Sequence, residues 1–315
     1  MPFLDLAETA TAANFSEAAY LAANPDVQEG VRSGRLASGR AHFDRLGQRQ
    51  GRRQRRLPEG FEAMMAQKLE RLAPHLRDDL PHRRLGPKVD YLSDELRALA
   101  TADPTANVSQ NAYDPHVEEL IAAHPDGLIL DCGAGQRDRY YSNVVNLEIV
   151  DYDTTDVLGI GEVLPFRDAS FDGVISVAVL EHVRDPFACA REIARVLKPG
   201  GRLLCAVPFL QPMHGYPHHY FNMTVEGLRA LFEDHLTVDQ QYVPTSLLPI
   251  WSLTWIVQSW AAGLPKEARK RFLSRRLSDF TADPLTLLDE SFVKDLPAEK
   301  NFELASGTYL FAHKP

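Results

Sequence analysis

Hydrophobic and polar positions follow two patterns between residues 127 and 207. Short apolar runs that fit buried strands alternate with a stretch whose apolar positions recur at helical spacing. Alternating strands and helices are typical of a parallel sheet covered by helices, so the pattern predicts an α/β fold. The predicted strands cover 127–130, 143–149, 173–177 and 202–207, the helix after the third strand runs through 191–197, and two late strands are expected at 236–243 and 307–313.

The chain before this region is expected to form two separate parts. Residues 1–57 are predicted to be a small helical module, in which a helix over Asn14–Leu21 is interrupted at Asn24-Pro25. Residues 58–108 are interpreted as helices broken by prolines and are expected to form a connector or lid. The sheet domain then covers 109–315, with a helical insertion at about 246–300.

One uncharged apolar run, Leu247–Leu264, approaches the length that is needed to span a bilayer. It is only moderately hydrophobic, because it contains a proline and several hydroxyl and amide side chains, and its tryptophans favour an interface. We therefore expect a buried or interfacial helix, with peripheral membrane contact as the alternative to burial.

Composition and charge indicate an ordinary globular protein. Hydrophobic residues make up 44% and charged residues 24% of the chain, and the formal net charge is −9. Nine arginines nevertheless fall between Arg32 and Arg56. A solvated helix face is the commoner explanation of such a cluster, and the acidic remainder of the chain would repel phosphates. We therefore expect no nucleic-acid partner, and the oligomeric state stays open.

The cysteines and the N-terminus favour a cytoplasmic location. Cys132, Cys189 and Cys205 have neither metal-ligand nor redox spacing, and their number does not suggest a disulfide framework. The N-terminal residues lack the basic start and the apolar run of a signal peptide.

The first strong strand ends in an acid that is followed by a glycine loop, Asp131-Cys132-Gly133-Ala134-Gly135. Glycine leaves bare backbone at the tip of a sheet, where a ligand can approach closely. The third glycine of the dinucleotide-binding pattern is missing, since Gln136, Arg137 and Asp138 follow. This departure argues against a nucleotide-dependent dehydrogenase.

Further motifs follow the glycine loop in a set order. They are Leu164-Pro165-Phe166, Ser170-Phe171-Asp172, Val179-Leu180-Glu181-His182-Val183 and Arg195-Val196-Leu197-Lys198-Pro199-Gly200-Gly201. In this order the chain resembles the class I S-adenosylmethionine-dependent methyltransferases of the type 11 subgroup, from about residue 128 to 232. The resemblance implies a Rossmann-like, mostly parallel seven-stranded sheet with helices on both faces and an antiparallel last strand. It also implies S-adenosylmethionine as the cofactor.

The resemblance assigns expected cofactor contacts to the first two strand ends. Asp131 is expected near the amino-acid ammonium of the cofactor, and Gly133 and Gly135 allow its close approach. Glu148 resembles the acid that accepts hydrogen bonds from both ribose hydroxyls. Asp151 is the competing ribose acid if the second strand runs longer.

Two later segments complete the expected cofactor site. Gly161 and Glu162 lie where relatives contact adenine, and simple loop packing is the alternative for both. Ser176 and Val177, with Ala178, resemble the residues that lie beside the reactive sulfonium.

Histidines supply the candidate catalytic groups. His214 is the first candidate for a general base and His219 the second, because methyl transfer to a hydroxyl requires removal of its proton. His182 is a third candidate, while the neighbouring Glu181 is explained by the favourable dipole at a helix start. A metal site formed by His214, His218 and His219 is disfavoured, so we expect no metal.

The expected acceptor is a sugar or glycan intermediate. The histidine and tyrosine loop after the fifth strand suits a polyhydroxylated molecule, and residues 20–52 resemble a short helical repeat attached to bacterial glycan-modifying proteins. A lipid-like, quinone or other small-metabolite acceptor remains an alternative. A non-catalytic protein that binds S-adenosylmethionine is a further alternative.

Overall fold

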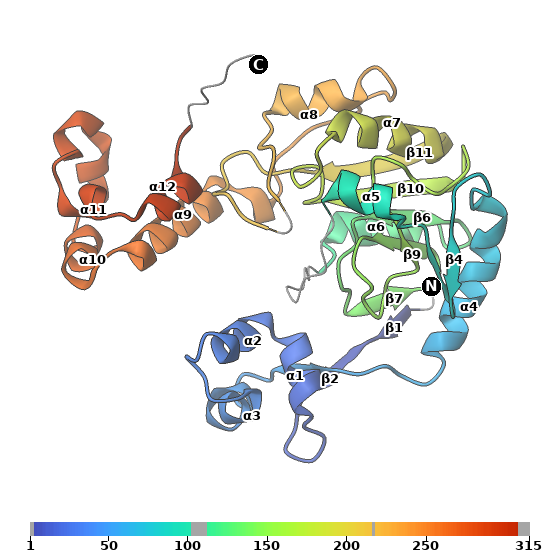
Figure 1. Ribbon diagram of the computed structural model, residues 1–315, viewed down its shortest axis with the longest axis horizontal. Coiled ribbons are helices and arrows are strands. Elements are labelled where there is room, and N and C mark those ends of the chain that lie inside the picture. The colour runs from blue at the N-terminus through green and yellow to red at the C-terminus, as the bar shows by residue number, and fades with distance from the viewer. Residues whose placement is uncertain (1–2, 102–111, 216–217, 308–315) are drawn as a thin grey trace.

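The computed structural model describes residues 3–101, 112–215 and 218–307, and its helices and strands surround one central sheet (Figure 1). The strands are β1 (Phe3–Asp5), β2 (Ala7–Thr9), β3 (Arg53–Arg55), β4 (Arg83–Leu85), β5 (Lys88–Asp90), β6 (Ile129–Cys132), β7 (Arg139–Tyr141), β8 (Val144–Glu148), β9 (Val157–Leu158), β10 (Phe171–Val177) and β11 (Leu197–Ala206).

The helices are distributed over the whole described chain. They are α1 (Glu17–Ala23), α2 (Pro25–Arg32), α3 (Gly39–His42), α4 (Phe61–Leu72), α5 (Asp94–Ala100), α6 (Pro115–Ala123), α7 (Pro186–Val196), α8 (Val225–Phe232), α9 (Pro249–Gly263), α10 (Lys266–Leu273), α11 (Ser291–Lys294) and α12 (Ala298–Leu304). Shorter helical segments are the π-helix Phe43–Gly47 and the 3-10 turns Ala73–His75, Thr245–Leu247, Leu277–Thr281 and Pro284–Leu287.

The central sheet has seven strands in the order β11-β10-β6-β8-β9-β5-β4. Every neighbouring pair is parallel except β4 and β5, which form an antiparallel hairpin at one edge. The parallel arrangement brings the carboxyl ends of β6, β8 and β10 to one side of the sheet. Ligands of open α/β sheets bind at that side.

Helices cover both faces of the sheet, as expected. Successive strand residues point to opposite faces, so Ile129 and Val144 pack in one cluster with the apolar side of α6. Their neighbours Leu130 and Val145 belong to the other cluster, with residues of α4 and α7. This alternation fixes the register of the central strands, because a shift by one residue would exchange the two faces.

The structure corrects two expectations about the sheet. Among the described residues the antiparallel strand is β4, which precedes the glycine loop, so the stretch interpreted as a helical connector also contains a sheet hairpin. Residues 236–243, predicted to be a strand, form no strand. The predicted strand 307–313 lies outside the described residues except for Gly307.

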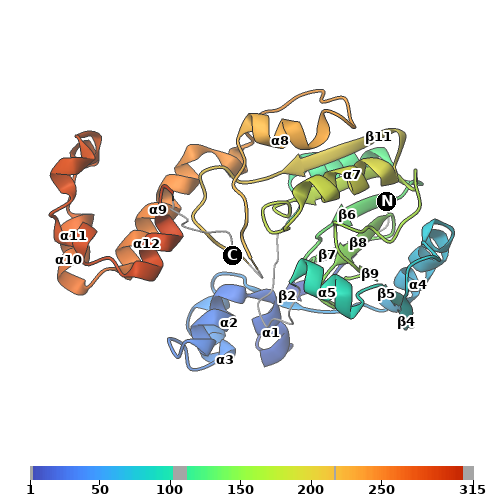
Figure 2. The same ribbon diagram turned by 45° about the horizontal axis from the view of Figure 1, so that its top comes forward.

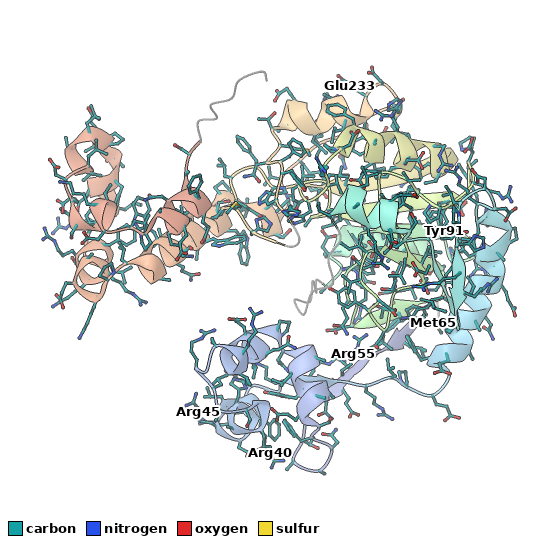
Figure 3. All side chains as sticks on the ribbon, viewed as in Figure 1. Arg40, Arg45, Arg55, Met65, Tyr91 and Glu233 are labelled. Carbon is teal, nitrogen blue, oxygen red and sulfur yellow. The ribbon has the colours of Figure 1, made fainter. Side chains whose placement is uncertain are left out.

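Residues 3–57 form helices and short strands that are joined to the core. β1 pairs with β7 of the core, and β2 pairs with β3. Figure 3 shows Arg55 at the junction and Arg40 and Arg45 on the far side of the module. Most arginines of the cluster are paired, in the contacts Arg32–Glu29, Arg40–Asp44, Arg52–Asp26, Arg53–Asp5, Arg55–Asp153 and Arg56–Glu8. Their charge is therefore largely compensated within the protein.

The helices α9 to α12 extend away from the sheet as an arm, which both views show (Figures 1 and 2). Of the two alternatives expected for this segment, a buried helix is excluded, because Ala261 is the one buried residue of α9; the interfacial helix stays a prediction. Of the described helices, none is long and apolar enough to cross a membrane.

Candidate active site

A cavity of about 600 Å³ opens at the carboxyl ends of β6, β8 and β10. Its wall contains backbone of the glycine loop, the acid that ends β8, the loop before α7 and one aromatic residue of the C-terminal arm. The lining residues include Gly133, Glu148, Gly159, Ile160, Gly161, Glu162, Ala178, Val179, His182, Gln211, His214 and Trp255. The cavity thus joins segments that are far apart in the sequence.

Gly133 has to be glycine for two reasons. Its φ of 81° lies in the left-handed region, and a Cβ at this position would lie 2.6 Å from Cγ2 of Val179. The loop backbone is therefore free of side-chain bulk where it lines the cavity. Gly135 also has a positive φ, but it does not line the cavity.

Asp131 lies behind the cavity wall and is fully buried. Its Oδ2 accepts hydrogen bonds from the Tyr113 hydroxyl at 2.5 Å and from Nη2 of Arg137 at 2.7 Å. Arg137 stands two residues after Gly135, and its guanidinium stacks 4.2 Å from the centre of the Tyr113 ring. Oδ1 of Asp131 is buried and accepts no hydrogen bond from the described residues. The acid therefore anchors the loop through a buried ion pair and keeps one oxygen unused.

Glu148 and not Asp151 is the acid that lines the cavity. Oε2 of Glu148 accepts a hydrogen bond from the Gly135 N–H at 2.7 Å, and Oε1 accepts one from the Ile149 N–H at 2.7 Å. Burial raises the pKa of Glu148, and these N–H groups act in the opposite direction. Asp151 is exposed and pairs with Lys88 instead. Of the two candidate acids, Glu148 is thus the one that a ligand in the cavity would meet, and its role as the ribose acid stays a prediction.

The remaining expected cofactor residues divide into two groups. Gly161 and Glu162 line the cavity, and burial raises the pKa of Glu162. Ser176 and Val177 do not line it; the residues after β10 that do are Ala178 and Val179. Ala178 has a φ of 56°, which turns the chain sharply at the end of β10.

Three candidate histidines meet at the other end of the cavity. The ring centroids of His182 and His214 are 5.4 Å apart, and those of His214 and His219 are 4.4 Å apart. Trp255 of α9 packs 5.0 Å from His214. His218 contributes only its carbonyl oxygen, and its side chain is exposed.

Hydrogen bonds fix the tautomers of these rings. Nδ1–H of His182 donates to the carbonyl of His218 at 2.7 Å, and Nδ1–H of His214 donates to the carbonyl of Pro212 at 2.8 Å. Both rings therefore keep Nε2 as the nitrogen with a lone pair. In His219, Nδ1 accepts from the His214 N–H and Nε2–H donates to Asn222. His219 is thus fully engaged and a weaker candidate for a base.

Glu181 is the site residue that our sequence analysis misjudged. It lies in a turn five residues before α7, so the helix-dipole explanation is wrong. The carboxylate is completely buried, and burial raises the pKa of Glu181 to about 7. Its Oε1 lies 3.7 Å from Nε2 of His182. The sequence signal was an acid between the apolar Leu180 and a histidine.

Comparison with known proteins assigns part of the chain to a family. Residues 130–205 match the methyltransferase domain family of type 11. Over these residues the chain carries an S-adenosylmethionine-dependent methyltransferase domain. The matched residues begin in β6 and end in β11, so they contain the glycine loop, Glu148 and Glu181.

Curated relatives of the methyltransferase domain match it over short stretches. A demethylmenaquinone methyltransferase of Corynebacterium glutamicum is 48% identical over 26% of this chain and 37% of its own length. The O-methyltransferase rstn1 of Aspergillus nomiae is 51% identical over 15% of this chain and 21% of its own length. The chain thus spans well under half the length of these relatives. The solved YcgJ protein from Bacillus is 19% identical over 51% of this chain and 83% of that chain, with a TM-score of 0.34.

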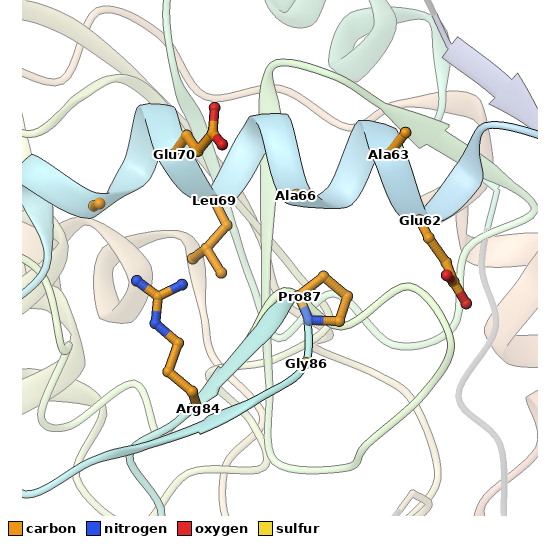
Figure 4. A pocket seen from close by; sticks show the side chains of 9 residues that line it. Glu62, Ala63, Ala66, Leu69, Glu70, Arg84, Gly86 and Pro87 are labelled. Atoms are coloured by element: carbon orange, nitrogen blue, oxygen red, sulfur yellow. The ribbon is translucent and has the colours of Figure 1, made fainter.

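A second hollow lies outside the methyltransferase cavity. It measures about 690 Å³ and is formed by α4 and the turn of the β4–β5 hairpin (Figure 4). Its lining includes Glu62, Leu69 and Glu70 of α4, Arg84 of β4 and Pro87 of the turn. It contains no glycine loop and none of the histidines named above, so the methyltransferase chemistry is assigned to the first cavity.

Proposed function

We propose that the protein transfers a methyl group from S-adenosylmethionine to an oxygen atom of a small acceptor. The observation that carries this proposal is the single cavity that joins the glycine loop and Glu148 to His182 and His214. The glycine loop and Glu148 suit a nucleoside with an attached amino acid. His182 and His214 suit an acceptor hydroxyl group that must lose a proton.

The lining residues fit the cofactor. Gly133 lines the cavity with backbone alone, so a ligand can approach the loop closely at this position. We assign the ribose hydroxyls to the Glu148 carboxylate and the adenine to Gly161 and Glu162. The buried Oδ1 of Asp131 is assigned to the ammonium group, directly or through water.

When bound, S-adenosylmethionine supplies an electrophilic methyl group. The protein's own residues then have to align the acceptor, exclude water and receive its proton. Well-oriented reactants can gain about 7–11 kcal/mol from alignment alone, so covalent catalysis is not required. Nε2 of His214 is assigned as the proton acceptor, because its Nδ1 is fixed as a donor to Pro212.

The acceptor that we favour is a sugar or glycan hydroxyl. At the histidine end, Gln211, His182 and His214 offer polar groups, and Trp255 offers a flat apolar surface. Such a combination suits a ring that carries hydroxyls on its edge and C–H groups on its face.

A second candidate acceptor is a quinone or lipid-like molecule. The observation that favours it is the apolar exposed surface of α9, in which Ile250 and Trp251 are both about 60% exposed. The name of the C. glutamicum relative points the same way. An apolar acceptor would reach the cavity along α9 and past Trp255.

Calorimetric titration with S-adenosylmethionine and S-adenosylhomocysteine tests the proposed cofactor. We expect both to bind with dissociation constants on the order of micromolar. Methyl transfer from labelled cofactor to nucleotide sugars, glycans and quinones would then identify the acceptor. Absence of binding for both compounds would overturn the proposal, and binding without transfer to any acceptor class would favour a non-catalytic sensor.

A further inference from the structure

Glu181 occupies an environment that a lone carboxylate seldom tolerates. Its side chain is fully buried, and neither oxygen accepts a hydrogen bond from the residues that the structure describes. The backbone is satisfied, since the carbonyl of Glu181 accepts from the N–H groups of Tyr220 and Phe221. A buried carboxylate without partners is destabilising unless a proton or a cation compensates it.

The two histidines beside this carboxylate are arranged like metal ligands. Nδ1–H of His182 and Nδ1–H of His214 each donate to a backbone carbonyl. Such a hydrogen bond fixes the tautomer and orientation of a metal-binding imidazole and directs the Nε2 lone pair to the ion. His219 has no lone pair to offer, because both of its nitrogens are engaged.

The distances suit a single ion. One ligand atom each from Glu181, His182 and His214 all lie within 4.8 Å of one another, and Oε1 of Glu181 is 3.7 Å from Nε2 of His182. Two ligands at about 2.1 Å from a tetrahedral zinc ion lie roughly 3.4 Å apart. Small side-chain rotations would therefore close the site around an ion.

We propose that Glu181, His182 and His214 bind a divalent transition-metal cation at the histidine end of the cavity. Two imidazoles and one carboxylate suit Zn²⁺, Co²⁺ or Fe²⁺ and leave coordination positions open to the cavity. From the sequence we expect no metal, because the histidines that lie close together along the chain are His214, His218 and His219. In the structure, His214 instead shares the site with His182 and Glu181.

The consequence for catalysis rests on the proposed function. An acceptor oxygen that binds an open position would have its pKa lowered by the cation. Because the Nε2 lone pair of His214 would then hold the ion, His214 would not receive the proton of the acceptor hydroxyl; the ion would acidify the hydroxyl and its proton would pass to water. A pair of adjacent hydroxyls, as sugars and catechols carry, could occupy two open positions.

The test is titration of chelator-treated full-length protein with Co²⁺, followed by visible absorption and calorimetry. We expect one equivalent to bind and to give the d–d bands of a site with nitrogen and oxygen ligands. Glu181→Gln and His214→Ala should each weaken binding at least tenfold, because even the loss of a supporting group beyond the ligands typically costs 10- to 100-fold in affinity. His218→Ala is the matched control, since this exposed ring lies in the same loop, and it should bind Co²⁺ like the wild type.

Each result of the Co²⁺ titration either supports or overturns the proposed metal site. Absence of stoichiometric Co²⁺ binding, or equal binding by wild type and both ligand variants, would overturn it, as would an equal loss in His218→Ala. Circular dichroism and thermal unfolding of Glu181→Gln check that the variant is folded, and His214→Ala provides a second, less buried substitution. Binding of S-adenosylhomocysteine without Co²⁺ binding refutes the metal site alone, whereas Co²⁺ binding without S-adenosylhomocysteine binding refutes the proposed function alone.

Discussion

Glu148 links the glycine loop to the proposed ribose site. Its carboxylate holds the Gly135 N–H and lines the cavity, while Asp151, three residues later, points to the surface and pairs with Lys88. In the sequence, Glu148 is the first candidate and Asp151 is the alternative if the second strand runs longer. They differ in the structure because β8 ends at Glu148, which sets one carboxylate at the sheet edge.

Replacing Glu148 by glutamine should weaken binding of S-adenosylhomocysteine by roughly 10- to 100-fold. Hydrogen bonds to a charged group contribute about 1.5–3 kcal/mol, and the new amide would face the Gly135 N–H with a donor in one of its two orientations. Because burial raises the pKa of Glu148, the wild type should lose affinity as the pH falls, starting above the usual range of an exposed glutamate. Calorimetry at several pH values measures both effects. Asp151→Asn is the control and should change affinity little; equal losses in both variants would refute the assignment.

Gly133→Ala should lower both stability and cofactor affinity. The left-handed backbone costs a non-glycine residue about 1–2 kcal/mol, and the Cβ contact with Val179 adds an overpacking cost of about 1–3 kcal/mol. Gly60→Ala separates the two causes, since Gly60 has a φ of 87° and open space around it. We expect denaturant unfolding to detect both variants, but only Gly133→Ala to bind S-adenosylhomocysteine at least about tenfold more weakly. Unchanged binding by Gly133→Ala would refute the loop as the cofactor site.

Sequence reasoning found most of this site but missed part of its chemistry. Gly133, Glu148, His182 and His214 were predicted because each stands at a fixed place in an ordered set of motifs. The role of Glu181 depends on what surrounds its carboxylate, and burial by distant segments cannot be inferred from neighbours along the chain. The contribution of Trp255 was missed for the same reason, because α9 reaches the cavity from outside the sheet.

At the scale of elements, the pattern of apolar residues along the chain predicted the central strands of the sheet but not the β4–β5 hairpin at its edge. β6, β8 and β10 are mostly apolar, β11 is apolar over its second half, Leu203–Ala206, and α7 has a clear apolar face. The β4–β5 hairpin was missed because Arg83–Leu85 and Lys88–Asp90 are largely polar; the Gly86-Pro87 dipeptide between them was the available turn signal. The strand expected at 236–243 does not form, since apolar content alone does not provide the neighbouring strand that its backbone needs.

One buried ion pair fastens α4 to the sheet. Lys68 is fully buried, and its Nζ lies 2.9 Å from Oδ2 of Asp156 and 3.4 Å from the centre of the Tyr140 ring. Lys68→Met should lower the free energy of unfolding by about 3–5 kcal/mol, because it leaves Asp156 buried without its cation. Gln67→Met, at an exposed position of the same helix, should change it by less than about 0.5 kcal/mol. Denaturant unfolding measures both; a Lys68→Met variant as stable as Gln67→Met would show that the pair contributes little.

At the scale of the whole molecule, two appendages meet the methyltransferase domain near its cavity. The C-terminal arm contributes Trp255, and the Met213 N–H donates to the carbonyl of Glu303 in α12. The N-terminal module approaches the segment after the glycine loop, where Nη1 of Arg55 donates to the carbonyl of Arg137 at 2.6 Å. Both appendages can therefore influence the site without belonging to the sheet.

Arg55 provides the sharpest test of how the N-terminal module is held. Its side chain is only 6% exposed and contacts Asp138 and Asp153, which are both about 40% exposed. In Arg55→Met these acids would remain solvated, so the cost is mainly the lost hydrogen bonds, about 1–3 kcal/mol. Since β1 still pairs with β7, the expected effect is local opening of the module by roughly 10- to 100-fold and not unfolding of the sheet.

Limited proteolysis within residues 1–57 should accelerate accordingly, because cleavage follows the population of the open form. The exposed Arg45 gives the matched control, Arg45→Met, which should be cleaved like the wild type. If Arg55→Met also weakened S-adenosylhomocysteine binding while Arg45→Met did not, the module would be energetically coupled to the glycine loop through Arg137. If the wild type, Arg55→Met and Arg45→Met were instead cleaved at equal rates, β1 alone would hold the module in place.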